Sequence, residues 1–266
     1  MNLFLSDLYR LIRDKALYVL LGIVMVFSFL KCLVYYFLTK DSPTPYAVDQ
    51  VLIQCISLDI LGTIVGIAIS LFNGKDFATN TIRNKIGCGN SRYLVFFIKV
   101  LENLLITTIF YFVSYLTAYF IGLGLFKQEF ASDFAAKVWC QYALLIGFSM
   151  IITCIVNVTK STKASIIVTI SLFVLLNAFS YILPTISDSQ IIQIICRSLY
   201  MVVSTMLVSA TDGTYTANVM NINGSSREVV TVNYDNLYLN CILIMVVYLA
   251  VALIISLIII RKQDYK

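Results

Sequence analysis

The sequence contains no histidine, which removes the side chain that most often serves as a general base or a metal ligand. Charged residues are also scarce, at 12% of the 266 residues, against about 25% in an average soluble domain. Apolar residues supply 60% of the chain, so little sequence is left over for a soluble domain. We therefore predict an all-α integral membrane protein with a single transmembrane domain over residues 1–266.

Motifs for enzyme chemistry are missing as well. No G-x-x-x-x-G-K-[ST] loop occurs to cradle the phosphates of ATP, and no G-x-S-x-G or H-E-x-x-H motif occurs. The seven cysteines form no C-x-x-C pair and mostly lie in apolar runs, so we expect neither a disulfide framework nor a metal site. We expect no enzyme activity and no cofactor on this chain. If ATP and Mg²⁺ drive it, they bind to a separate polypeptide.

Six apolar runs are each long enough to cross a bilayer, which takes ~20 residues. The expected spans are about residues 16–38, 51–72, 93–126 and 138–158, a fifth that ends near Leu183 before Pro184, and 237–260. With these spans, twelve Lys and Arg residues fall in the inner segments and five in the outer segments. Because basic residues favour the cytoplasmic side, we predict a multi-pass protein of the cell membrane with both termini in the cytoplasm.

The first fifteen residues predict an interfacial helix on the cytoplasmic surface. Its apolar residues fall on one side and its charged residues on another: Leu5, Leu8, Leu11 and Ile12 against Asp7, Arg10 and Asp14.

Residues 184–236 form the largest extracellular segment in this topology. Residues 189–210 predict outer helices that lie in, or dip into, the outer leaflet, because a seventh span would place the basic C-terminal tail outside. Residues 215–222 and 227–234 flank Asn223-Gly224, which predicts a small β-hairpin.

The longest cationic interruption in the first half of the chain is residues 74–92. Four basic residues there accompany the single acid Asp76, namely Lys75, Arg83, Lys85 and Arg92. Phe77, Ile82 and Ile86 recur at helical spacing, and Gly87-Cys88-Gly89 ends the pattern. Such a short amphipathic helix can lie on a membrane surface or in a groove of a partner protein. The alternative is an ordinary positive loop that only sets topology.

The amino-acid sequence of this segment resembles that of the loop after the second span of ABC-2 type transporter permeases. The matching residues are Asp76-Phe77, Thr81-Ile82-Arg83-Asn84-Lys85, Gly89 and Ser91-Arg92. In that family the segment is the coupling helix, which docks on an ATP-binding subunit. The resemblance therefore implies that ATPase coupling depends on Asp76, Phe77, Thr81, Ile82, Arg83, Lys85 and Arg92. The sequence departs from the family where Asp76 replaces Glu and where Asn80 replaces Gly. We expect Asn80 to cap the helix.

The same resemblance implies a function. The chain would be the permease subunit of an ABC exporter, paired with a second permease chain, identical or related, and with two ATP-binding subunits that carry ATP and Mg²⁺. Membrane lipid is the other expected partner, and nucleic acid is not one. The small permeases of antimicrobial-peptide or bacteriocin export and immunity systems are the most similar, which implies a peptide or amphiphile as substrate. Two alternatives stay open: an ion-coupled secondary transporter, and a membrane anchor or sensor that transports nothing.

Two features inside the predicted spans concern packing. Lys31 and Asp59 are isolated charges at similar depth in the first two spans, so we predict that they form an ion pair. The alternative is that Lys31 extends to the interface while Asp59 contacts a hydroxyl group or water. Gly62, Gly66 and Ser70 share one helix face, which predicts close helix packing, either within the chain or against a second chain or along a transport route.

Overall fold

The computed structural model of the chain describes residues 3–40, 48–126, 130–186, 195–196, 198–210, 214–223 and 226–262. Within these residues, six helical segments are long and apolar enough to cross a membrane, which confirms the predicted helical, multi-pass membrane protein. The segments are α2 (Lys15–Thr39), α3 with α4 (Val48–Ile56 and Leu58–Ala78), α6 (Arg92–Leu125), α7 (Phe134–Thr159), α8 (Thr162–Ile186) and α11 (Leu237–Lys262).

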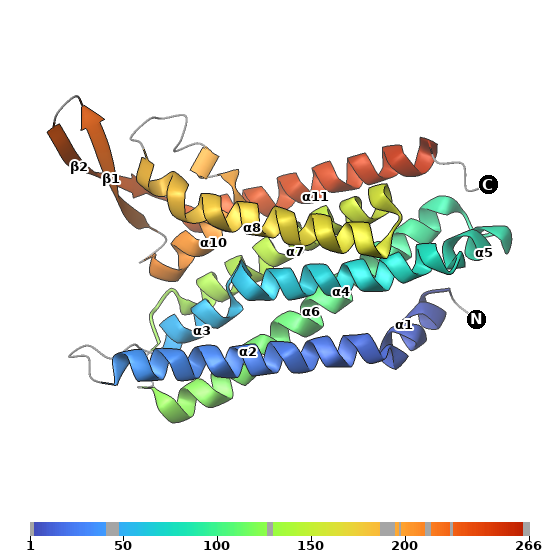
Figure 1. Cartoon of the computed structure of the whole chain (residues 1–266), viewed down its shortest axis with the longest axis horizontal. Coiled ribbons are helices and arrows are strands. Elements are labelled where there is room, and N and C mark those ends of the chain that lie inside the picture. The colour runs from blue at the N-terminus through green and yellow to red at the C-terminus, as the bar shows by residue number, and fades with distance from the viewer. Residues whose placement is uncertain are drawn as a thin grey trace.

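The long helices run side by side, and the shorter elements gather at the two ends of the bundle (Figure 1). The start of α1 (Leu3–Arg13), the short helix α5 (Thr81–Gly87) and the end of α11 lie together at one end, called here the α5 end. The opposite end, called here the hairpin end, holds α10 (Tyr200–Ser209) and the strands β1 (Tyr215–Asn223) and β2 (Ser226–Tyr234). An even number of spans places the two termini on the same side.

The two strands pair antiparallel, with Tyr215 opposite Tyr234 and Asn223 opposite Ser226. The expected turn at Asn223-Gly224 lies partly outside the described residues, which omit 224–225. Helix α10 has 10 residues, too few to cross a bilayer, and it packs against α7 and α8 with Met201 and Leu207 buried. The rest of the expected outer helices falls largely outside the described residues.

The segment α3–α4 forms the centre of the bundle. In its most apolar window 72% of the residues are buried, whereas the figure is 17% for α2, α8 and α11. The outer faces of α2, α8 and α11 expose large apolar residues such as Phe37, Ile167 and Val247. Such faces suit a lipid environment, in which helices associate through close packing and interhelical hydrogen bonds.

Three sequence-based boundaries are wrong. The second span is not a continuous helix over 51–72, because it begins at Val48, breaks at Ser57, where ψ is 155°, and continues to Ala78. The residues from Gly74 to Ala78, expected in the cationic loop, are therefore the last turns of α4. The fifth span continues past Pro184 to Ile186. A hydropathy pattern reports composition along the chain, and polar contacts made by other helices decide where a buried helix breaks or ends.

The two ends of the bundle can be tested for sidedness by cysteine labelling. Cys88 follows α5 and is the one exposed cysteine of the described residues, and Asp235 is exposed between β2 and α11. In variants that retain one cysteine only, we expect a membrane-impermeant maleimide to label Asp235→Cys on intact cells and Cys88 only after lysis. Labelling of both positions from the same side would contradict the six-span topology.

Candidate functional site

The cationic segment begins with a bend between α4 and α5 at Asn80. This residue has φ of 55°, in the left-handed region, and its side chain makes no capping hydrogen bond. Asn80 therefore occupies the expected N-cap position, but its side chain does not cap the helix. Asn and Gly tolerate left-handed backbone better than other residues do, so the position requires a backbone conformation rather than a capping side chain. Helix α5 ends at Gly87, and Gly89, with φ of 89°, turns the chain into α6.

The apolar side of α5 faces the protein. Ile82 is buried, and Phe77, Ile82 and Ile86 line a small pocket that the first turns of α6 complete with Val95 and Phe96. Ile82 is buried while Phe77 and Ile86 are half-buried, so the apolar side of α5 is turned toward α6.

Asp76 is the centre of a buried charge cluster. Its carboxylate is 1% exposed and forms ion pairs with Arg10 of α1 and Lys99 of α6, and Lys99 also donates to Glu102 at 2.7 Å. Arg10 and Lys99 both lie over the ring of Phe72, at 5.2 and 4.9 Å from its centroid. Two cations thus balance two acids, which a buried cluster requires for stability. Asp76 joins three helices and leaves no surface for a partner.

Two further ion pairs connect the segment to α1. Lys85 of α5 pairs with the buried Asp7, and Lys75 of α4 pairs with Asp14 at 2.6 Å. The charged side of α1 therefore faces the protein. The expected grouping of its apolar residues is only partly right, because Leu11 is buried while Leu5 and Ile12 are exposed, together with Tyr9. These three exposed residues follow one another at i, i+4 and i+7 and form an apolar stripe.

The outer face of α5, defined here as Arg83, Asn84 and Gly87, is exposed. Arg83 gives this face its positive charge, and Arg92 is exposed at the start of α6. The structure therefore divides the residues predicted for coupling by exposure. Asp76 and Ile82 are buried, Phe77, Thr81 and Lys85 are half-buried, and Arg83 and Arg92 are exposed.

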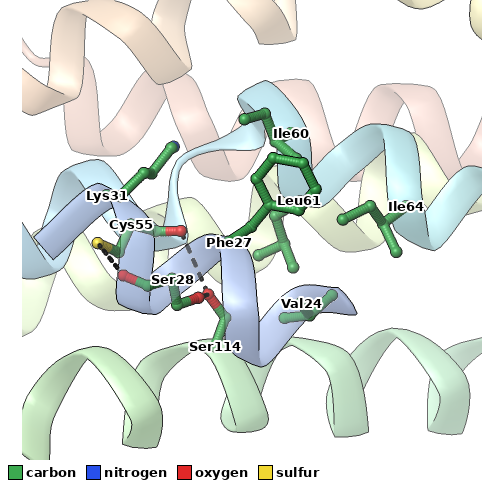
Figure 2. A pocket seen from close by; sticks show the side chains of 9 residues that line it. All are labelled: Val24, Phe27, Ser28, Lys31, Cys55, Ile60, Leu61, Ile64 and Ser114. Atoms are coloured by element: carbon green, nitrogen blue, oxygen red, sulfur yellow. Dashed lines mark hydrogen bonds between the residues drawn. The ribbon is translucent and has the colours of Figure 1, made fainter. Parts of the chain in front are cut away.

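A second polar site surrounds the break at Ser57, in the first third of the second span. The carbonyl of Gln54 accepts a hydrogen bond from the Lys31 ammonium at 3.0 Å, and the carbonyl of Cys55 accepts one from the Ser114 hydroxyl at 3.2 Å. Figure 2 shows the side chains of α2 and α6 that converge on the end of α3. Backbone groups freed within a membrane require such partners, because no water is present to bind them.

Lys31 and Asp59 meet at this break. Lys31 Nζ lies 3.8 Å from Asp59 Oδ2, which also accepts a hydrogen bond from Ser57 Oγ at 3.0 Å. Lys31 contacts the C-terminal end of α3, and Asp59 lies in the first turn of α4. Each charge is thus placed at the helix end whose partial charge is opposite to its own. The two half-helices and the ion pair together compensate charges that would otherwise be costly in a membrane.

Residues far along the chain close the site from the hairpin end. The Ser204 hydroxyl of α10 accepts a hydrogen bond from the Leu58 amide at 3.2 Å and donates to Gln141 Oε1 at 2.7 Å. Gln141 Nε2 donates in turn to the Ser204 carbonyl at 2.9 Å. Sequence reasoning missed these residues. The signal that could have found Gln141 is an amide in an apolar run.

Exchanging the two charges tests the ion pair. We expect Lys31→Asp and Asp59→Lys each to reduce the yield of folded protein about tenfold or more, because an unbalanced charge in a span costs ~2.5–3.5 kcal/mol and ~1.4 kcal/mol is tenfold. The double exchange should recover part of the yield. Recovery will be incomplete, since both charges then face unfavourable helix ends, at ~0.3–1 kcal/mol each. Size-exclusion chromatography of the solubilised protein measures the yield. A double variant no better than the worse single variant rejects the pair.

The small residues of α4 pack against α8 of the same chain. A Cβ atom added at Gly66 would lie 2.6 Å from Thr169 Cγ2, and one at Gly74 would lie 2.7 Å from Thr162 Cα. Between them, Ser70 Oγ lies 3.3 Å from Thr169 Oγ1. Gly62 has Phe173 of α8 as its nearest neighbour. Helix α8 thus covers the face that could otherwise have met a second chain or lined a route.

No family model matches the chain, and no curated protein sequence matches it.

Proposed function

We propose that this chain is the permease subunit of an ATP-driven exporter of the ABC-2 type. It pairs with a second permease chain, identical or related, and two separate ATP-binding subunits carry ATP and Mg²⁺. The α5 end lies on the cytoplasmic side of the cell membrane, together with both termini. The hairpin end lies outside.

The observation that carries this proposal is the way in which neighbouring helices hold α5. Its apolar side and Lys85 hold it to α6 and α1, while the outer face of α5 stays exposed and positively charged. A short helix fixed in this way cannot move independently of the helices that hold it. It can therefore transmit a push from a docked subunit to them. A loop that serves only to set topology would not need a buried charge cluster at its base.

The route of such a push runs along α4. This helix continues without interruption from Ala78 back to Leu58, next to the break at Ser57. Gly66 and Gly74 keep it in close contact with α8, so movement of α4 has to displace α8 as well. ATP-driven closure of the subunits below would therefore change the packing around Lys31 and Asp59. A peptide or an amphiphile is the proposed cargo, on the basis of the resemblance to small peptide-exporting permeases.

The positions of α1, α10 and the two strands are consistent with this arrangement. The stripe of Leu5, Tyr9 and Ile12 suits contact between α1 and the headgroup region of the inner leaflet. Helix α10 would lie in the outer half of the membrane, and the strands β1 and β2 would form an extracellular hairpin.

One observation favours a second candidate, the ion-coupled secondary transporter. Broken helices and intramembrane charges mark the binding sites of that class, and the break at Ser57 with Lys31 and Asp59 has both features. The charge of Asp59 is already balanced by Lys31, however, so the site carries no excess charge with which to attract a proton or a sodium ion. A membrane anchor or sensor would need neither a fixed α5 nor the helix break at Ser57.

Purification of the full-length chain distinguishes these classes. We expect the tagged protein, extracted in mild detergent from cells that produce it naturally, to bring with it a polypeptide with a phosphate-binding loop and Mg²⁺-dependent ATP hydrolysis. Export that collapses on addition of an ionophore at constant ATP, with no such polypeptide bound, would instead identify the ion-coupled class.

A further inference from the structure

Two cysteine side chains meet between α2 and α3, in the half of the bundle nearer the hairpin end. Their sulfur atoms, Cys32 Sγ and Cys55 Sγ, lie 3.8 Å apart. Both residues are buried, with exposed fractions of 0% and 3%, and both are free thiols in the structure. A disulfide bond is ~2.05 Å long, so an approach of about 1.8 Å separates this pair from a disulfide.

A small hollow beside Cys55 gives access to the pair. Helices α2, α4 and α6 and the end of α3 line it together (Figure 2). Its volume of about 10 Å³ is near the least that can hold one water-sized molecule. Phe27, which also lines the hollow, is exposed on the outside of the bundle. Cys55 is therefore the member of the pair that a molecule of this size meets first, since Cys32 does not line the hollow.

Hydrogen bonds from two helices hold Cys55 beside Cys32. The Ser28 carbonyl of α2 accepts a hydrogen bond from the Cys55 thiol at 3.9 Å, and the Ser114 hydroxyl of α6 donates to the Cys55 carbonyl at 3.2 Å. The hydroxyl groups of Ser28 and Ser114 also bond to each other at 2.9 Å. Because Cys55 is held from both sides, oxidation of its sulfur would leave that sulfur next to the second thiol. A neighbouring thiol of this kind converts an oxidised cysteine into a disulfide.

We propose that Cys32 and Cys55 form a modification site at which hydrogen peroxide converts the two thiols into a disulfide. The Cys55 sulfur attacks one peroxide oxygen, the O–O bond breaks, and the thiol proton leaves with the other oxygen as water. The product is a sulfenic acid. The Cys32 sulfur then attacks the sulfenic sulfur, the S–S bond forms, and the hydroxyl group leaves with the Cys32 proton as a second water. Both sulfur atoms are oxidised, and both peroxide oxygens are reduced.

The disulfide ties α2 to the last turn of α3, two residues before the break at Ser57. In the same place Lys31, which precedes Cys32, donates to the Gln54 carbonyl at 3.0 Å. Once the two helices are joined covalently, the polar site around the break can no longer open between α2 and α3. The modification does not depend on how, or whether, the chain moves a substrate.

Peptide mapping of the full chain after peroxide treatment tests the proposal. Trypsin cleaves after Lys31 and Lys40, so the two cysteines fall in separate peptides, 32–40 and 41–75, which contain no other cysteine. Protein purified in mild detergent is treated with hydrogen peroxide, its remaining thiols are blocked with N-ethylmaleimide, and its peptides are analysed by mass spectrometry without reduction. We expect the two peptides to be linked in most of the chains and to separate after reduction with dithiothreitol.

Cys154→Ser is the matched control, because it removes a half-buried cysteine of α7 outside the pair. This variant should give as much linked peptide as the unsubstituted chain. Cys32→Ser should give none and should leave Cys55 as sulfinic or sulfonic acid. Unlinked peptides from the unsubstituted chain, under conditions that oxidise the exposed Cys88, overturn the proposal. An equal yield of linked peptide from chain unfolded in sodium dodecyl sulfate also overturns it, because the fold then does not select the pair.

Thermal unfolding tests whether the disulfide fixes the two helices to each other. The midpoint of the linked chain should lie several degrees above that of the same chain after reduction, because a disulfide restricts the unfolded state. Peroxide-treated Cys32→Ser should show no such rise. Equal midpoints for the linked and the reduced chain would contradict a disulfide that holds α2 to α3 in the folded protein.

Discussion

Arg83→Glu is expected to reduce ATP hydrolysis by the assembled complex to the level of the isolated ATP-binding subunits. Arg83 is exposed on α5 and makes no ion pair within the described residues, so its charge is available to a docked subunit. Apposing like charges at an interface costs several kcal/mol, and ~1.4 kcal/mol corresponds to tenfold in affinity. The affinity of α5 for the docked subunit should therefore fall tenfold or more, and ATP hydrolysis by the complex should fall with it. Hydrolysis by detergent-purified complexes at saturating Mg²⁺-ATP measures it.

Lys15→Glu is the matched control for this experiment. Lys15 is exposed at the α5 end, at the start of α2, and its reversal makes the same change in net charge outside α5. This variant should keep nearly full hydrolysis, and both variants should elute as folded protein. Equal activity of Arg83→Glu and the unsubstituted chain, with the ATP-binding subunit still bound, would remove α5 from the coupling pathway.

Asp76→Asn is expected to destabilise the protein by about 3 kcal/mol. The substitution leaves the buried Lys99 with Glu102 alone and leaves Arg10 without its carboxylate partner. Breaking a buried ion pair by removing one partner costs ~3–5 kcal/mol, and we expect the lower end because Glu102 remains. At ~2–4 °C per kcal/mol, the thermal midpoint in detergent should fall by roughly 6–12 °C.

Asp14→Asn provides the comparison, since it removes the same charge from a pair at the surface. Its partner Lys75 is 47% exposed, and such pairs contribute ~0–1 kcal/mol. The midpoint should move by no more than a few degrees. If the two variants shift the midpoint equally, the cluster around Asp76 is not the buried junction of α1, α4 and α6 described above.

Composition and periodicity were enough to predict the membrane-spanning helices, because the length and apolarity of each run are local properties of the chain. The break at Ser57 could not be predicted in this way. It depends on hydrogen bonds that Lys31 and Ser114 donate to backbone carbonyls and that Ser204 accepts from the Leu58 amide, and these three residues meet only in the folded bundle. The same limit applies to Gly74, which the sequence placed in a loop and which packs against Thr162 of α8.

The cationic segment illustrates the difference between recognising a site and knowing how it is arranged. Its charges and its apolar spacing are visible in the sequence, but the burial of Asp76 depends on Arg10 and Lys99 from two other helices. A pattern of residue types therefore located the segment. It could not separate the residues that hold α5 in place, such as Lys85, from Arg83 on its outer face.

Site-specific photo-crosslinking from α5 tests the central claim most directly. A benzophenone amino acid at Asn84, next to Arg83 on the exposed outer face, should form an adduct with an ATP-binding subunit when membranes from the producing cells are irradiated. The same amino acid at Asp235, at the hairpin end, should form none. An Asn84 reporter that never yields an adduct with a protein carrying a phosphate-binding loop, in membranes where export is active, would contradict the proposal that this chain is an ABC permease subunit.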